Sequence, residues 1–127
     1  MDKVINNWLA SSRYDFKTAE AIYKSRRYVY VIFMCHLAIE KTLKAIVAAK
    51  TRRVPPKTHD LLLLVKLASL DIPETHRGIL MRLNQASIPT RYPEDIAKLI
   101  KYYNRPAADK YLQESRGFLG WLRKQIR

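Results

Sequence analysis

The sequence is poor in the residues that cross-link or interrupt a chain, with one cysteine, three glycines and six prolines in 127 residues. A lone cysteine cannot form an intrachain disulfide, and Cys35 falls within an apolar stretch, so we expect a buried, reduced and non-catalytic thiol in an intracellular protein. No apolar run is long enough to cross a bilayer, and residues 1–16 lack the charged-then-apolar order of a signal peptide. We therefore predict a cytoplasmic protein without a membrane partner.

Acidic residues are also few, at 11 against 24 lysines and arginines, which gives a formal net charge of +13. Such a field concentrates polyanions, so it favours nucleic acid or an acidic protein as a partner. In the alternative interpretation, the basic residues are spread over the surface for solubility or heat tolerance. Two local basic clusters lie at opposite ends of one predicted helix: Lys24, Arg26 and Arg27, then Lys50, Arg52, Arg53 and Lys57.

Apolar residues recur every three or four positions, which predicts an all-α fold. The length allows one core without a disulfide or metal, so we predict a single helical domain over residues 1–127. The short turn at Arg26 and Arg27 predicts that the first two helices form an antiparallel hairpin. The expected helices run from Asp2, as N-cap, to Arg26, then over about 28–50, 59–70, 73–86 and 94–103, with a last one opened by Pro106.

Three local predictions concern helix ends and faces. Thr58 is expected to cap a third helix that begins at His59. The segment 87–93 holds two prolines, each of which lacks a donor and disfavours helix in the residue before it, so we predict a rigid, non-helical linker. On the last helix, one apolar stripe is expected to face the core: Ala108, Tyr111, Leu112, Ser115, Phe118, Leu119, Leu122 and Ile126.

The helix at 28–50 is apolar around most of its circumference, yet it carries His36, Glu40 and Lys44 in one sector. Burying unpaired charge is costly, so these groups must either pair or face a wet groove. In the first interpretation, Glu40 and Lys44 pair with each other or with a charge on another helix. In the second, the stripe of His36, Glu40 and Lys44 lines an interface groove. His36 and Glu40 fall short of the three or four ligands of a metal site, so we predict neither metal nor cofactor.

Arg91 is the second candidate for function. It lies between Pro89 and Pro93 and beside Tyr92, so it presents a planar guanidinium suited to a phosphate next to an aromatic ring. The alternative is that Arg91 pairs with a core carboxylate, Asp15 or Glu40, and fixes the linker.

Together these residues resemble the HEPN family of small helical proteins. The similarity comprises Trp8, Ser12 and Asp15, then HLAIEKTLKA in the second helix, PKTHDLLLL at the third, and LNQASIPTRYPED after the fourth. The resemblance implies an up-down antiparallel bundle of four to five helices that forms a homodimer, with the last helices and the arginine-bearing linkers near the twofold axis. Many members are similar to ribonuclease toxins that are neutralised by a minimal nucleotidyltransferase encoded beside them.

The catalytic signature of that family is an arginine followed four to six residues later by a histidine. Arg91 stands at the corresponding place, but Asp95, Ile96 and Ala97 fill the window, so the resemblance leaves open whether the chain is an enzyme. Arg53 stands six residues before His59, at the literal spacing, and Arg52 stands one residue further away. We interpret that spacing as coincidence and His59 as a first-turn or packing residue.

The leading hypothesis is a homodimeric protein that binds a nucleotide or RNA phosphate and works with a minimal nucleotidyltransferase in a toxin–antitoxin type of system. Its ligand-binding residues are Arg91, Tyr92, Lys44, Glu40 and His36. The first alternative is a metal-independent ribonuclease toxin that uses Arg91 with a displaced acid–base group such as His36 or Glu40. The second is a purely structural protein-interaction module.

Overall fold

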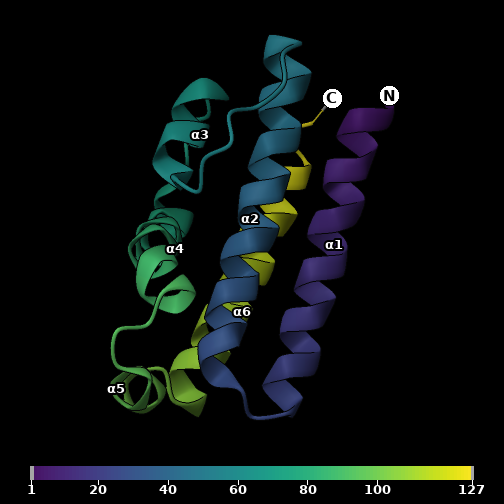
Figure 1. The fold of residues 1–127 in the computed structure, drawn as a ribbon. Coiled ribbons are helices and arrows are strands. Elements are labelled where there is room, and N and C mark those ends of the chain that lie inside the picture. Colours follow the sequence, from purple (N-terminus) through teal and green to yellow (C-terminus); the bar gives the residue numbers. More distant parts are fainter. Residues whose placement is uncertain (1, 127) are drawn as a thin grey trace.

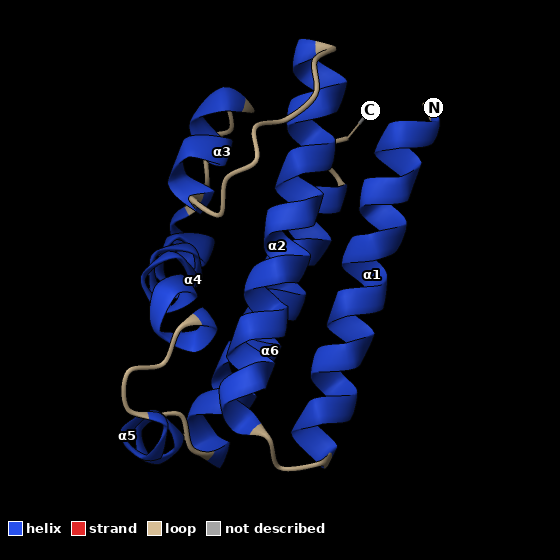
Figure 2. Cartoon of the chain, viewed as in Figure 1, coloured by secondary structure: helices blue, strands red, loops and turns tan. Residues whose placement is uncertain are grey.

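A computed structural model of the chain describes residues 2–126, which form six α-helices and no strand. This confirms the all-α prediction, with the six helices in the order expected along the sequence and one more than the upper end of the four to five that the family resemblance implies (Figures 1 and 2). The helices are α1 (Lys3–Lys24), α2 (Tyr28–Thr51), α3 (Leu61–Leu67), α4 (Glu74–Arg91), α5 (Ile96–Tyr102) and α6 (Arg105–Arg123). None of them is both long and apolar enough to span a membrane.

Helix α2 is the central element and packs against each of the other five helices. Figure 1 shows α1 and α2 as an antiparallel hairpin, with α6 behind α2 and with α3 and α4 on the side away from α1. The turn of the hairpin places Arg26 at φ 64°. The two helices lie close together, and Ser12 on α1 contacts α2 directly. Its Oγ donates to the Ala38 carbonyl at 2.7 Å and lies 2.7 Å from Thr42 Oγ1.

Side-chain caps fix where the helices begin. Asp2 caps α1 as predicted, since its carboxylate accepts from the Val4 amide at 2.7 Å. The predicted start of the third helix was wrong, because α3 begins at Leu61 with Asp60 as its N-cap. An ionised carboxylate at 60 accepts from two amides and out-competes the Thr58 hydroxyl. His59 therefore lies in the loop before α3, and the helix also ends early, at Leu67.

The stripe predicted on the last helix is buried, as expected for an amphipathic helix that covers a bundle. Ile126 is partly buried beyond the end of α6. The buried members within α6 are Ala108, Tyr111, Leu112, Ser115, Phe118, Leu119 and Leu122.

Helix α4 contradicts the predicted linker, because it continues past Ala86 and through Pro89 to Arg91. A proline inside a helix loses one backbone hydrogen bond and costs about 3 kcal/mol. Burial offsets that cost, since Ala86, Ser87 and Thr90 all pack into the core. Thr90 Oγ1 also donates to the Ala86 carbonyl at 2.7 Å. Arg91 is consequently held by the last turn of a helix, and Tyr92 is its C-cap.

The bounds of α5 differ from the predicted ones. Helix α5 spans Ile96–Tyr102, shorter than the expected 94–103, because Asp95 is its N-cap.

Cys35 is fully buried, and burial raises the pKa of its thiol to about 12. The thiol is therefore protonated and unreactive at neutral pH.

Candidate functional site

Helix α2 places His36, Glu40 and Lys44 on one buried stripe, as their four-residue spacing predicts. Lys44 Nζ donates to Glu40 Oε2 at 3.0 Å. The side chains of Glu40 and Lys44 are only 4% and 8% exposed, so this ion pair is shielded from water. A charged pair is kept at this depth only if the remaining lone pairs of the carboxylate are also satisfied.

The other oxygen of Glu40 satisfies that requirement through residues from two other parts of the chain. His59 Nδ1, from the loop before α3, lies 2.8 Å from Glu40 Oε1, and Arg91 Nη2, from the end of α4, lies 3.4 Å from the same atom. His36 Nδ1 is 3.6 Å away. One buried carboxylate thus joins α2, α4 and the α2–α3 loop.

Hydrogen-bond partners decide which nitrogen of each imidazole carries a proton. His36 Nε2 lies 3.1 Å from the His59 carbonyl, an acceptor, so this nitrogen donates and Nδ1 is left unprotonated. The bare Nδ1 then accepts from Arg91 Nη2 at 3.4 Å. Burial is the main reason that the pKa of His36 is lowered to about 4, so the ring is neutral at neutral pH. For His59, the carboxylate of Glu40 selects Nδ1 as the donor.

Arg91 is held on two sides. Its guanidinium carbon lies 4.8 Å from the centre of the Phe33 ring, in a cation–π contact that faces the bundle. All of its hydrogen bonds to described residues come from Nη2, whereas its Nε is buried without a partner among them. Of the two carboxylates considered from the sequence, Glu40 is the one near Arg91, while Asp15 pairs with Lys41 Nζ at 2.7 Å.

The charges of this site do not cancel. Lys44 and Arg91 carry one positive charge each, Glu40 carries one negative charge, and His36 is neutral, so one positive charge is in excess before His59 is counted. In a site with little water, such an excess favours an anionic ligand. Lys44 also lies 5.5 Å from the ring centre of Trp8 on α1, so the site extends to the first helix.

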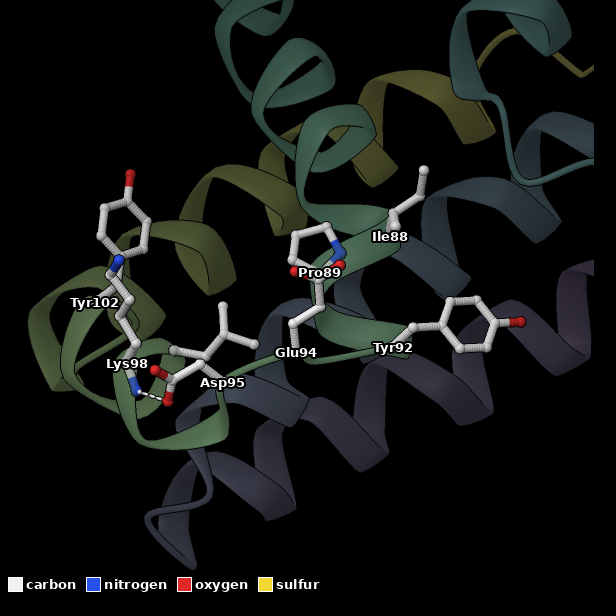
Figure 3. A pocket seen from close by; sticks show the side chains of 8 residues that line it. Ile88, Pro89, Tyr92, Glu94, Asp95, Lys98 and Tyr102 are labelled. Atoms are coloured by element: carbon white, nitrogen blue, oxygen red, sulfur yellow. Dashed lines mark hydrogen bonds between the residues drawn. The ribbon is translucent and has the colours of Figure 1, made fainter.

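Tyr92 is the one predicted ligand-binding residue that lies outside the Glu40 cluster. It is 72% exposed and lines a groove of about 470 Å³ beside the end of α4 (Figure 3). The other lining residues are Ile88, Pro89, Glu94, Asp95, Lys98, Leu99 and Tyr102. This groove is mainly apolar, in contrast to the charged cluster around Glu40.

The interpretation of His59 from the sequence was wrong. Its side chain is 53% exposed, so it does not pack in the core, and it contacts Glu40 across 19 positions of sequence. Two contacts fix the chain around it, since Asp60 caps α3 and the Leu61 amide donates to Asn84 Oδ1 at 2.8 Å. The signal available in the sequence was the polar triplet at 58–60 after two prolines, directly before an apolar run.

No three His, Cys, Asp or Glu side chains within residues 2–126 are grouped so that they could hold a metal ion. His36 and His59 both approach Glu40, but the nitrogens that face it are engaged in the contacts described above. The contacts described above support hydrogen bonding, charge stabilisation and proton transfer by these residues.

The neutral state of His36 predicts that stability depends on pH. Its pKa is about 4 in the folded chain against 6.5 ordinarily, so protons bind the unfolded chain better. Its stabilising contribution is complete above pH 6.5 and is lost as the pH falls toward 4. We expect the free energy of unfolding to fall by about 2 kcal/mol between about pH 7 and about pH 5 in urea titrations.

A His36→Gln variant, whose amide can still donate to the His59 carbonyl, should lose most of this slope. The control is His76→Gln, which changes a histidine that is stacked 5.3 Å from Phe118 and lies away from Glu40. An unchanged slope in the His36 variant would contradict the assignment.

A comparison with protein families matches residues 5–125 to the HEPN domain, so the chain belongs to the HEPN domain family. Among solved structures, TT1696 from Thermus thermophilus is 25% identical over 98% of this chain and 100% of that chain, with a TM-score of 0.80. ST0689, described as an archaeal HEPN homologue, is 20% identical over 99% of this chain and 100% of its own, with a TM-score of 0.79. No curated protein is significantly similar in sequence.

Proposed function

We propose that this HEPN protein binds the phosphate of a nucleotide or of RNA at Arg91 and Lys44, and that it acts as a homodimer. The observation that carries the proposal is the convergence of two basic side chains on one buried carboxylate, Glu40. Glu40 restrains both cations, so less side-chain entropy is lost when they bind a ligand. The excess positive charge of the site favours a negatively charged ligand.

The geometry of Arg91 supports phosphate as the ligand. Because its hydrogen bonds to described residues use Nη2, the donors on Nη1 are left for a ligand. A guanidinium of fixed orientation matches the planar spacing of two phosphate oxygens. The side chain is 12% exposed and His59 is 53% exposed, so the ligand would enter from the His59 side.

The basic field supports a polyanion over a lone nucleotide. The α2–α3 loop carries the exposed residues Arg52, Arg53 and Lys57 and ends at His59, so positive charge continues from the surface to the site. A net charge of +13 draws RNA to the whole molecule. Site and field together favour RNA that enters along this loop.

The proposed homodimer rests on an apolar stripe on the outer side of α4. Met81 and Ile88 are seven residues apart, so they lie on one face of α4, and Tyr92, the C-cap of the helix, follows Ile88 by four residues. The three side chains are 43%, 69% and 72% exposed. Isolated exposed apolar residues are common, but a row of them on one helix is typical of an interface. A second copy seated here would lie next to Arg91.

Family membership is the support for a minimal nucleotidyltransferase as partner, in a toxin–antitoxin type of system. The fold leaves the exposed tyrosines Tyr92 and Tyr102 beside one groove, where a partner protein could reach them. Coexpression with a nucleotidyltransferase encoded beside this chain, followed by affinity purification, tests the pairing. Recovery of this chain without its neighbour would contradict it.

The phosphate site is tested by titrating the protein with ATP and with a short single-stranded RNA. We expect Arg91→Ala to weaken RNA binding about 10- to 100-fold, because a charge-assisted contact to phosphate is worth about 1.5 to 3 kcal/mol. Affinity should also fall steeply as salt rises, with a smaller slope in the variant.

The matched control is Arg77→Ala, which removes an arginine from the same helix that is 62% exposed and 3.9 Å from Asp71. It should leave RNA affinity within a factor of about three, as expected for a charge outside the site. Equal binding by wild type and Arg91→Ala at moderate salt would remove Arg91 from the site.

A metal-independent ribonuclease is the second candidate, and one observation favours it. Arg91 Nη2 lies 3.4 Å from the imidazole of His36. A second imidazole, that of His59, binds Glu40, the carboxylate that also contacts Arg91. A guanidinium stabilises negative charge that develops on a phosphate, and an imidazole accepts protons, and phosphodiester cleavage without a metal uses both functions. Growth arrest on induction that Arg91→Ala relieves would support this candidate, and harmless overproduction would count against it.

A further inference from the structure

The basic cluster of Lys24, Arg26 and Arg27 lies at the end of α2 opposite the α2–α3 loop, so it does not lead to the Glu40 site. All three residues are exposed, and Arg26 takes the left-handed backbone of the α1–α2 turn. Their side chains form no hydrogen bond or ion pair with any residue in the described range 2–126. Three positive charges are therefore available to a ligand at this end of the bundle.

The same end of the bundle carries a groove. Figure 1 shows α5 and the α1–α2 turn at one end of the molecule, and a groove of about 250 Å³ lies between them. Its lining includes the buried side chains of Val29 and Tyr103 and the exposed side chains of Ile96 and Ile100. This surface, lined by residues 26–30, 96, 100 and 103, is called the turn–α5 groove below.

Helix α5 presents an apolar face that has no partner in the single chain. None of its seven residues is buried. Ile96 and Ile100 are four positions apart, so they lie on one face, and they are 45% and 58% exposed. Leaving two such side chains in water is unfavourable, and a ligand that covers them gains their hydrophobic contribution. The groove therefore favours a ligand with an apolar group.

Charge gives the second property of the ligand. Segments 24–30 and 96–105, which meet at this end, contain no aspartate or glutamate. Arg26 and Arg27 line the groove itself, next to its apolar side chains. Such an arrangement favours a ligand that combines carboxylates with an apolar group. The basic residues of the two segments are Lys24, Arg26, Arg27, Lys98, Lys101 and Arg105.

We propose that the turn–α5 groove binds a short acidic segment of another protein. One apolar side chain of that segment enters the groove, and carboxylates on either side of it pair with Arg26 and Arg27. The proposal does not depend on the phosphate site, so equal RNA affinity of wild type and Arg91→Ala would leave it standing.

Two other occupants fit the groove less well. A second copy of this chain carries a net charge of +13, so it would bring positive charge to a surface that is already positive. A nucleic-acid backbone would pair with Arg26 and Arg27, but its phosphates would leave Ile96 and Ile100 uncovered. An acidic peptide with one apolar side chain satisfies both halves of the groove.

The test uses two short fluorescent peptides in which glutamates flank one central residue. The central residue is phenylalanine in the first peptide and alanine in the second, so the two have the same charge. Binding to the full chain is followed by fluorescence anisotropy at moderate salt. The difference between the peptides measures the apolar contact separately from the attraction between charges.

Two variants locate the contact. Ile100→Gln removes an exposed apolar side chain of the groove and leaves the charge unchanged, whereas Arg26→Gln combined with Arg27→Gln removes its two cations. The matched control combines Arg52→Gln with Arg53→Gln, which removes the same charge at the other end of α2. Arg52 also has a left-handed backbone, at φ 59° against 64° for Arg26.

We expect the phenylalanine peptide to bind wild type at least about 10-fold more tightly than the alanine peptide, because its ring leaves water on binding. Ile100→Gln should weaken binding of the phenylalanine peptide about 5-fold, and the Arg26 and Arg27 double variant at least about 10-fold. The control should stay within a factor of about three of wild type.

Equal affinity of wild type for the two peptides would overturn the proposal. A loss in the Arg52 and Arg53 control as large as that in the Arg26 and Arg27 variant would also overturn it, since only net charge would then matter. A short single-stranded RNA is titrated against Ile100→Gln as well, and we expect its affinity within a factor of about three of wild type. An RNA loss as large as the peptide loss would assign the groove to nucleic acid instead.

Discussion

Replacing Glu40 with glutamine is expected to lower the free energy of unfolding by about 3 to 5 kcal/mol. The wild-type carboxylate is 4% exposed and faces Lys44 at 3.0 Å and Arg91 at 3.4 Å. Glutamine keeps the shape of the side chain but removes the negative charge, so two cations would remain buried without compensation. The measurement is chemical denaturation at neutral pH.

Two comparisons separate this effect from a general loss of charge. Glu20→Gln removes an exposed carboxylate that pairs with Arg116 at 2.9 Å, and we expect a cost below about 1 kcal/mol. Combining Glu40→Gln with Lys44→Met should recover part of the lost stability, because one of the unpaired cations is removed as well. A Glu40→Gln variant as stable as Glu20→Gln would contradict the electrostatic account of the site.

Replacing Ile88 with aspartate is expected to weaken the proposed homodimer by at least about 100-fold, equivalent to about 2.7 kcal/mol. Ile88 is 69% exposed in the single chain and shares a face of α4 with Met81, and Tyr92 is the C-cap of the same helix. A carboxylate buried at that face would lose its hydration without gaining a partner. Light scattering after size-exclusion chromatography over a range of concentrations measures the shift toward monomer.

The matched control for this prediction is Leu62→Asp, which introduces the same charge at an exposed leucine of α3, outside the α4 stripe. It should leave the mass distribution unchanged. If wild type is a monomer at high concentration, or if both variants behave alike, the α4 face is not the interface between copies.

The sequence was sufficient to predict the helices whose faces are amphipathic. The apolar stripe of α6 is buried as predicted, and the stripe of His36, Glu40 and Lys44 lies on one side of α2. Both patterns follow from the helical period alone. The sequence also offered Asp15 and Glu40 as carboxylates that could pair with Arg91, and in the structure Glu40 is the one that does.

The sequence was not sufficient where tertiary packing outweighs a local rule. Two prolines predicted a linker at 87–93, but burial of Ala86, Ser87 and Thr90 extends α4 to Arg91. A proline penalty is visible in the sequence, whereas the burial that offsets it depends on packing of α4 against other helices, chiefly α2, and this packing is not written in the local sequence.

His59 illustrates a second limit. Its contact with Glu40 depends on where Asp60 ends the loop and starts α3, and local propensity does not distinguish Thr58 from Asp60 as the cap with enough certainty. A shift of two residues decides whether His59 lies in the first turn of a helix or reaches back to α2. The site therefore depends on the position of a helix start, which differs by two residues between the prediction and the structure.

The central claim is that Arg91 and Lys44, restrained by Glu40, bind a phosphate group. A crystal structure of the protein grown with a ribonucleotide tests it most directly. We predict electron density for a phosphate within hydrogen-bonding distance of Arg91 Nη1 and Lys44 Nζ. A nucleotide bound at another surface, with Arg91 still directed only at Glu40 and His36, would contradict the claim.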